Sequence, residues 1–405
     1  MYIKHLFAFI IITILSCGST APDNKKTNAT FDLVDLGGIS NKEKAILASE
    51  SYNQYRTLLL NRGFNGQIIL AKKGEIIFED YQGYLSRKTM EPISASTPLH
   101  IASTSKTFTA IAILRLIEQG KISLENKVAD LIPQFPYNNI TLFHLLTHRS
   151  GLPNYTSFME WGGRTVIVKR NKRGRIIQRK VVKSVDYRPK EEFLTNDLLI
   201  AYINAKKTPS PQAAGRAFNY CNTNFALLAS IVEKVTGQSF PNYMRDSIFI
   251  PLGMNNTFVF SLKDTANYIP SYQANGAPYP LQKLDCIYGD KNIYSTVRDL
   301  LIWDKALYGG DFISKGILEK AFTGYSNERR GTHNYGLGFR LLLQPTDTVV
   351  YHNGWWHGNN VVFKRHIKDS ATVIIIGNKF NRSIYGAGKL ANVLTGNIDT
   401  TVTID

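Results

Sequence analysis

The sequence predicts an α+β fold in which one antiparallel sheet, built from both ends of the chain, is covered by helices and carries an inserted helical subdomain. Strand-like runs occur near the two ends, at 66–84 and 335–377, and an all-helical region, interrupted by a basic hairpin, is expected from about 103 to 260. Strands and helices are thus segregated along the chain, which favours an α+β arrangement. The 405 residues are 43% hydrophobic, enough for a packed core.

The first residues have the pattern of a targeting segment. Lys4 and His5 precede an apolar run that is too short to span a bilayer. The run ends in Leu15-Ser16-Cys17, which resembles a bacterial lipobox, so residues 1–17 are expected to be a lipoprotein-type signal peptide with Cys17 lipidated. Cleavage near Ala21 is the alternative. We expect a lipid anchor on a bacterial membrane, on its periplasmic or surface side, within the cell envelope.

The body of the protein is expected to begin after a tether. Residues 18–40 are rich in Ser, Thr, Asn, Asp and Gly, as in a flexible linker, and residues 41–397 form the predicted domain. An amphipathic helix is expected over 41–62, followed by hairpin strands at 66–84. Later strands are expected near 335–343, 347–353, 359–366 and 371–377, with a last helix over 385–394.

The strongest chemical signal is Ser-Thr-Ser-Lys at 103–106, at the start of a long apolar helical pattern. A serine hydroxyl is a weak nucleophile until a base takes its proton. A lysine three residues later on a helix lies on the same face, so Lys106 is expected close to Ser103. The motif is weak by itself, because S-x-x-K also occurs by chance at polar helix starts.

Two further motifs strengthen this hypothesis. Tyr220-Cys221-Asn222 precedes a second helical pattern, and His352-Asn353-Gly354 follows a strand-like run. The order Ser-x-x-Lys, Tyr-x-Asn, His-x-Gly resembles that of the serine β-lactamase and penicillin-binding-protein superfamily, in particular its class C β-lactamase, DD-carboxypeptidase and esterase branch. Matching segments, in the same order as in the family, are 64–78, 145–153, 251–257, 294–300 and 335–339.

The resemblance implies a role for each motif residue. Ser103 would be the nucleophile that forms an acyl-enzyme, and Lys106 its base when neutral. Tyr220 would move protons to the leaving group and from the attacking water, and Asn222 would orient Lys106 and the substrate amide. His352 would position a substrate carboxylate or tune Tyr220.

The third motif is also expected to shape the substrate site. The backbone N–H groups of Ser103 and Trp355 would form an oxyanion hole. Asn353, Gly354 and Trp356 would bind substrate. Trp355 departs from the small residue that many relatives have there, so its indole is expected to narrow the cleft; a packed aromatic lip without a specific role is the alternative.

Three classes of function compete. The first is a hydrolase that turns over a small-molecule or peptide ester or amide: an esterase, a D-alanyl peptidase or a β-lactamase-like enzyme. The second is a penicillin-binding acyl-trap or sensor with little turnover. The third is a catalytically dead wall-binding module, which the intact Ser103, Lys106, Tyr220 and His352 argue against.

No cofactor and no metal are expected, because no Cys/His cluster has ligand spacing and no Gly-rich loop precedes a helix.

The formal net charge of +17 is concentrated in one segment. Residues 164–190 hold eleven Lys and Arg against one acid, and within them 164–183 reads as a basic β-hairpin inserted relative to the family. It would attract an anionic cell-wall polymer, or be a solvated hairpin whose charges prevent aggregation. Nucleic acid is not expected as a partner, because no binding motif accompanies the charge.

Cys221 and Cys286 are expected to be free buried thiols.

Overall fold

The computed structural model describes residues 38–133, 135–159, 164–171, 176–183, 191–207, 210–328 and 330–396. The expected signal peptide with Cys17, nearly all of the tether and the tip of the basic hairpin lie outside the described residues. None of the helices in the described ranges is long and apolar enough to cross a membrane.

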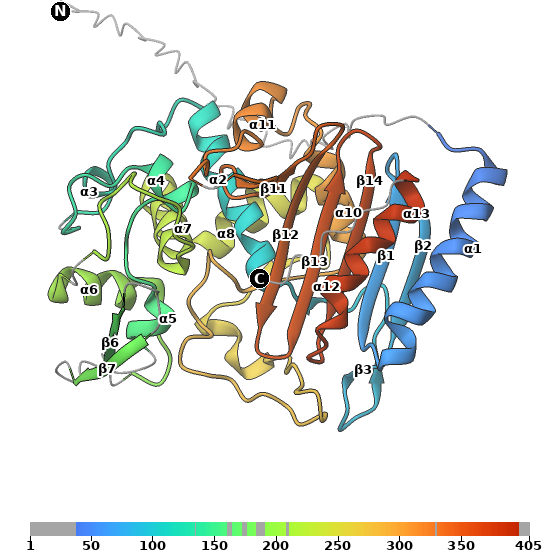
Figure 1. Ribbon diagram of the computed structural model, residues 1–405, viewed down its shortest axis with the longest axis horizontal. Coiled ribbons are helices and arrows are strands. Elements are labelled where there is room, and N and C mark those ends of the chain that lie inside the picture. Colours follow the sequence, from blue (N-terminus) through green and yellow to red (C-terminus); the bar gives the residue numbers. More distant parts are fainter. Residues whose placement is uncertain are drawn as a thin grey trace, which may run out of the picture.

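The main sheet is antiparallel and joins the two ends of the chain (Figure 1). Its strands, in spatial order, are β10 (His333–Tyr335), β11 (Arg340–Leu343), β12 (Thr348–Trp356), β13 (Asn359–His366), β14 (Ala371–Gly377), β1 (Gly66–Lys72) and β2 (Glu75–Gln82). The late strand β14 pairs with the early strand β1 along its whole length, from Gly66 opposite Gly377 to Lys72 opposite Ala371. The expected α+β fold is therefore confirmed.

Strand β14 carries apolar side chains on both of its sides because helices cover both faces of the sheet. Val373 and Ile375 join one buried cluster, whereas Ile374 and Ile376 join the other. The first face packs against α1 (Asn41–Leu58), α12 (Ser383–Ala387) and α13 (Ala391–Thr395). The second packs against α10 (Val297–Ala306) and the larger helical region. Strand alternation directs neighbouring side chains to opposite faces, so β14 needs an unbroken apolar run.

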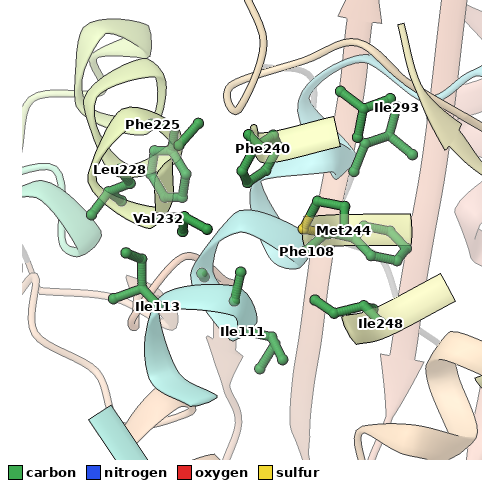
Figure 2. Packing of buried hydrophobic residues seen from close by; sticks show 14 of the residues in the cluster. Phe108, Ile111, Ile113, Phe225, Leu228, Val232, Phe240, Met244, Ile248 and Ile293 are labelled. Atoms are coloured by element: carbon green, nitrogen blue, oxygen red, sulfur yellow. The ribbon is translucent and has the colours of Figure 1, made fainter. Parts of the chain in front are cut away.

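The helical region is built around α2 (Ser105–Glu118) and α7 (Asn222–Thr236), which pack against each other (Figure 2). Phe108 of α2 stacks on Trp303 of α10, with ring centroids 4.1 Å apart. Gly237, at φ +71°, ends α7 in a left-handed C-cap, a conformation that glycine adopts at little cost. The remaining helices are α3 (Val128–Leu131), α4 (Leu142–Leu146), α5 (Tyr155–Phe158), α6 (Asn196–Lys206), α8 (Phe240–Met244), α9 (Ile250–Leu252), α11 (Lys315–Ala321) and the short helices η1 (Leu60–Arg62), η2 (Ala102–Thr104), η3 (Arg245–Phe249), η4 (Leu262–Asn267) and η5 (Gly388–Leu390).

Three small sheets complete the described structure. The strands β5 (Leu99–His100), β9 (Ile293–Ser295) and β8 (Phe258–Val259) form one of them. The expectation of an all-helical region between 103 and 260 was therefore wrong at β8, a two-residue strand too short to show an alternating pattern. The strands β3 (Tyr84–Ser86) and β4 (Glu91–Pro92) form a second sheet.

The third small sheet is the inserted hairpin of β6 (Arg164–Arg170) and β7 (Ile176–Lys183). The two strands pair antiparallel, with Arg164 opposite Lys183. In Figure 1 this hairpin lies at the end of the molecule away from α1.

Candidate active site

The serine and lysine of the first motif lie side by side, with the serine half-buried and the lysine buried. Ser103 lies in the short helix η2, and Lys106 in the first turn of α2. The Nζ atom of Lys106 is 3.1 Å from the Oγ atom of Ser103 and donates a second hydrogen bond, of 2.7 Å, to the backbone carbonyl of Asp290. Lys106 is fully buried. The helical spacing predicted from the sequence therefore brings the two side chains into hydrogen-bond contact.

The turn that carries the serine is held in an unusual backbone conformation. Ala102 has φ +47°, a left-handed conformation that costs a non-glycine residue about 1–3 kcal/mol. Strand β12 runs so close to this turn that a Cβ atom on Gly354 would lie 2.6 Å from the carbonyl oxygen of Ile101 and 3.0 Å from the Cβ atom of Ala102. The hydroxyl of Thr104 also donates to the carbonyl of His352, at 3.2 Å. Glycine at 354 is thus needed for this close approach.

The tyrosine of the second motif lies next to the lysine of the first. The ring centroid of Tyr220 is 5.0 Å from Nζ of Lys106, and Asn222 is the first residue of α7. The Oδ1 atom of Asn222 is buried and has no hydrogen-bond partner among the described residues. The family resemblance implies that Asn222 contacts Lys106, but in this structure its Oδ1 atom makes no hydrogen bond to that lysine. The atom remains available as an acceptor close to Tyr220 in the chain.

A histidine from the Leu-Thr-His segment supports the Tyr220 loop. His148 is fully buried, with its ring centroid 4.3 Å from that of Tyr220. Its Nδ1 atom accepts the backbone N–H of Cys221, at 3.2 Å. Burial, and then the charges of Lys106 and Arg340, hold the pKa of His148 well below its usual range. A neutral imidazole therefore fixes the backbone next to Tyr220.

The histidine of the third motif is also neutral. Burial, and then the charges of Arg340 and Lys106, hold the pKa of His352 well below its usual range. Its Nδ1–H donates to the carbonyl of Asn353, at 2.7 Å, which leaves Nε2 as an acceptor, 3.5 Å from the hydroxyl of Tyr335. Its ring centroid is 6.3 Å from that of Tyr220. A buried neutral imidazole offers a substrate carboxylate no positive charge, so this geometry favours the tuning of Tyr220.

The two tryptophans after Gly354 differ in position. Trp355 is 63% exposed, and its Nε1–H donates to the carbonyl of His357. Trp356 is half-buried and packs against the larger core cluster. Side chains alternate along a strand, so Trp356 shares the face of β12 that carries Gly354 and the nucleophile turn. The expectation that the Trp355 indole narrows the cleft therefore does not match the structure, in which the exposed Trp355 side chain lies on the opposite face of β12 and Trp356 lies on the face of Gly354.

Two charged residues hold Trp356 in place. Its Nε1–H donates to the carboxylate of Asp285, at 2.8 Å, and the ammonium of Lys291 lies 4.8 Å from its ring centroid. The same Asp285 carboxylate contacts Nε2 of His357, at 3.0 Å. Lys291 also donates to the hydroxyl of Tyr155, at 2.8 Å, and Tyr155 in turn donates to Asp290. The side chain of Trp356 is therefore held by a network of buried polar and charged groups.

Sequence reasoning missed three residues of the site. The guanidinium of Arg340 lies 5.1 Å from the ring centroid of Tyr220, and its only sequence signal is its position directly after the Tyr-Gly-Leu-Gly-Phe segment. Asp290, whose carbonyl accepts from Lys106, has no motif at all. His100 lies two residues before the left-handed Ala102 and contacts its N–H.

No group of three or more His, Cys, Asp or Glu side chains that could hold a metal ion occurs in the described part of the chain. Cys221 and Cys286 are both buried and unpaired, and burial raises the pKa of each thiol to about 11.

Comparison with known proteins places this geometry in a family. The family model described as Beta-lactamase matches residues 62–388, which is most of the chain. The chain is 32% identical to penicillin-binding protein 4* of Bacillus subtilis over 345 residues, covering 80% of this chain and 70% of that protein. It is 27% identical to the putative penicillin-binding protein PbpX of the same organism, over 73% of this chain and 67% of that one.

Solved structures share the fold. A penicillin-binding protein from Bacillus halodurans superposes with a TM-score of 0.68 at 24% identity, covering 85% of this chain and 99% of that one. A class C β-lactamase superposes with a TM-score of 0.69 at 17% identity, covering 90% and 100% of the two chains. Together with the family match and the relative at 32% identity, these findings show that the chain belongs to the β-lactamase family of serine hydrolases, which includes penicillin-binding proteins.

Proposed function

We propose that the protein cleaves an ester or amide through an acyl-enzyme on Ser103. The observation that carries this proposal is the 3.1 Å contact between Oγ of Ser103 and Nζ of the buried Lys106. To act as the base, Lys106 must be neutral, so that the lone pair of Nζ can accept the serine proton while an N–H still donates to the backbone carbonyl of Asp290. Oγ then attacks the substrate carbonyl carbon while its proton passes to Lys106.

The intermediate collapses when the bond to the leaving group breaks and that group receives a proton. Tyr220, next to Lys106, is suited to deliver this proton and to regain it from the water that later attacks the acyl-enzyme. Lys106 returns its proton to Oγ as the acyl group leaves, so the products are a free acid, an alcohol or amine, and the regenerated Ser103. The unpaired Oδ1 of Asn222 supports a contact with a substrate N–H at this point.

The backbone of β12 supplies the second half of the proposed oxyanion hole. Strand β11 pairs with β12 only as far as Tyr351, opposite Arg340, so the end of β12 that carries Trp355 extends past its neighbour. A strand that extends past its neighbour can offer N–H and C=O groups to an extended ligand. This supports the proposal that the backbone N–H groups of Ser103 and Trp355 donate hydrogen bonds to the developing oxyanion. It also supports the proposal that this end of β12 binds the substrate.

The substrate class requires a direct test. Relatives are named penicillin-binding proteins, and a structural neighbour with 19% identity is a D-amino acid amidase, so D-alanyl peptides, β-lactams and simple esters are the substrates to compare. The screen uses a D-Ala-D-Ala peptide, a chromogenic cephalosporin and a short-chain nitrophenyl ester. Steady turnover of any of them supports a hydrolase. A stoichiometric burst with an acylated Ser103, followed by no turnover, supports the alternative, a penicillin-binding acyl-trap.

We also propose a place for the protein at the bacterial cell envelope. The lipobox-like Leu15-Ser16-Cys17 supports a lipid anchor on Cys17. Mass spectrometry of the mature N-terminus tests it: a diacylglycerol-modified Cys17 is expected, and an unmodified terminus downstream of it would contradict the proposal.

The basic hairpin 164–183 is proposed to bind an anionic cell-wall polymer. Its support is the charge of this segment together with its form, a separate two-stranded sheet rather than an extension of the main one. Deletion of the hairpin tests it, because salt-sensitive retention on such a polymer should then weaken.

A further inference from the structure

A buried histidine outside the three motifs contacts the nucleophile turn. Nδ1 of His100 accepts the backbone N–H of Ala102, at 3.1 Å, and Ala102 is the left-handed residue directly before Ser103. His100 is 4% exposed, and its ring meets the ring of Tyr294 edge-on, with centroids 5.0 Å apart. The acceptor that stabilises the strained turn is therefore itself fixed by packing.

The second nitrogen of His100 reaches the segment that holds the lysine. Nε2 of His100 is 3.3 Å from Oδ1 of Asn292, a residue that is also left-handed, at φ +75°. Two residues earlier, the carbonyl of Asp290 accepts the hydrogen bond from Lys106. His100 thus connects two strained segments, one that carries the serine and one that holds its lysine.

The protonation state of His100 follows from these partners. Burial lowers the pKa of His100 to about 3, so the imidazole is neutral at ordinary pH. Nδ1 accepts the Ala102 N–H, so the single ring proton is on Nε2 and is donated to Oδ1 of Asn292. A protonated imidazole would lose the Nδ1 lone pair and with it the contact to the turn.

We propose that His100 is a positioning residue that holds Ala102 in its left-handed conformation and thereby aims the hydroxyl and the backbone N–H of Ser103. His100 does not reach the substrate and transfers no proton. This inference rests on the proposed role of Ser103 as nucleophile. The side chain of His100 would thus help to fix both the geometry of the oxyanion hole and the distance between Ser103 and Lys106.

The test compares two substitutions of nearly equal shape, His100→Asn and His100→Leu. Asparagine places a carbonyl oxygen close to the position of Nδ1, whereas leucine offers no acceptor; both lack Nε2 and the ring. The rate of acylation is measured as the pre-steady-state burst of nitrophenolate from a short-chain ester, over a range of ester concentrations. We expect the leucine variant to acylate about ten- to a hundredfold more slowly, because loss of one oxyanion-hole donor costs roughly 10²–10³-fold. We expect the asparagine variant to stay within about threefold of the unmodified protein.

A purely structural role predicts a different pattern. If His100 serves only to fill the core, the two variants should lose thermal stability while the folded enzyme acylates at equal rates in both. Equal acylation rates, whether both fast or both slow, would therefore overturn the inference. We expect the concentration of ester at half-maximal burst rate to change little, because the turn contacts the reacting carbonyl and not the rest of the substrate.

Two additions keep the test decisive. If the leucine variant does not fold, Asn292→Gly replaces it, because glycine adopts φ +75° without strain and removes the partner of Nε2; acylation about three- to tenfold slower is expected, and an unchanged rate overturns the inference. Labelling with a fluorophosphonate, in which Oγ bonds to phosphorus and fluoride leaves, reports on Ser103 itself. No label on Ser103 in the unmodified protein would refute the proposed function, whereas equal labelling of all variants would refute only the role of His100.

Discussion

Substitution of Gly354 by alanine isolates the contact between β12 and the nucleophile turn. The added Cβ atom would lie 2.6 Å from the carbonyl oxygen of Ile101, and real Cβ atoms essentially never approach closer than 3.0 Å. The strand and the turn must therefore separate by at least a few tenths of an ångström. A displacement of about 1 Å in a catalytic group can cost 10²-fold in rate, so we expect acylation to slow by roughly five- to fiftyfold. That factor corresponds to about 1–2.3 kcal/mol of activation free energy.

The assay follows acylation by the ester burst and stability by urea unfolding. The strain of an inserted methyl group in a packed region costs typically about 1–3 kcal/mol of stability, so the variant is assayed where it remains folded. Gly316→Ala is the matched control, because Gly316 lies in α11 and no heavy atom is within 4 Å of its added Cβ. It should gain about 0.5–1 kcal/mol from helix propensity and acylate normally. A Gly354→Ala variant that acylates within about twofold of the unmodified protein would refute the view that this contact aligns Ser103.

The other predictions concern the nucleophile, the substrate, the pH dependence and the hairpin. Ser103→Ala should leave the fold intact and remove hydrolysis; more than about a hundredth of the original activity would show that the serine assignment is wrong. Short-chain nitrophenyl esters should be turned over faster than a cephalosporin, because we expect the indole of Trp356, held by Asp285 and Lys291, to crowd the space that a fused bicyclic ring needs. Faster steady-state turnover of the cephalosporin would exclude this substrate preference. The free energy of unfolding should fall as pH drops below about 6.5, since the unfolded chain then protonates three histidines, His100, His148 and His352, that stay neutral when folded. The slope should approach at most about 4 kcal/mol per pH unit in urea titrations, and a pH-independent midpoint between about pH 5 and 7 would contradict it. Deletion of 164–183 should spare ester hydrolysis but weaken a salt-sensitive retention on peptidoglycan or teichoic-acid-like polymer; equal retention with and without the hairpin would favour the solvated-hairpin alternative.

The positions of two central strands, β13 and β14, could be predicted from the sequence, whereas the order of the strands within the sheet emerges only from the tertiary structure. The runs at 359–366 and 371–377 coincide with β13 and β14, since β14 is mostly apolar and Val361, Val362 and Phe363 form an apolar centre in β13. The expected strand at 335–343 is instead two strands, β10 and β11, separated by a turn in which the N–H of Gly336 donates to the carbonyl of Phe339. Short-range periodicity does not distinguish a continuous strand from one interrupted by such a turn.

The contact between Ser103 and Lys106 was predictable because it needs only one turn of helix. The contacts of His100 and Asp290 were not, because they depend on a segment almost two hundred residues away in the chain. The neutral state of His352 was also hidden, since it results from burial and from Arg340 on a neighbouring strand. Sequence motifs therefore identified the candidate reacting groups, whereas the groups that hold and tune them emerged only from the tertiary structure.

The pairing of β14 with β1 has a consequence for how the protein is made. Until Gly377 has been synthesised, the hairpin of β1 and β2 lacks its inner neighbour, and the edge of β1 stays open with Ile68, Ile69 and Leu70 unburied. An open apolar strand edge invites pairing with other chains, and contacts between distant segments form slowly. The turn that carries Ser103 packs closely against β12, another late strand. A nascent chain that ends before β12 would therefore contain Ser103, Lys106 and Tyr220 and still have no site, so the enzyme becomes competent only after almost all of its chain has emerged.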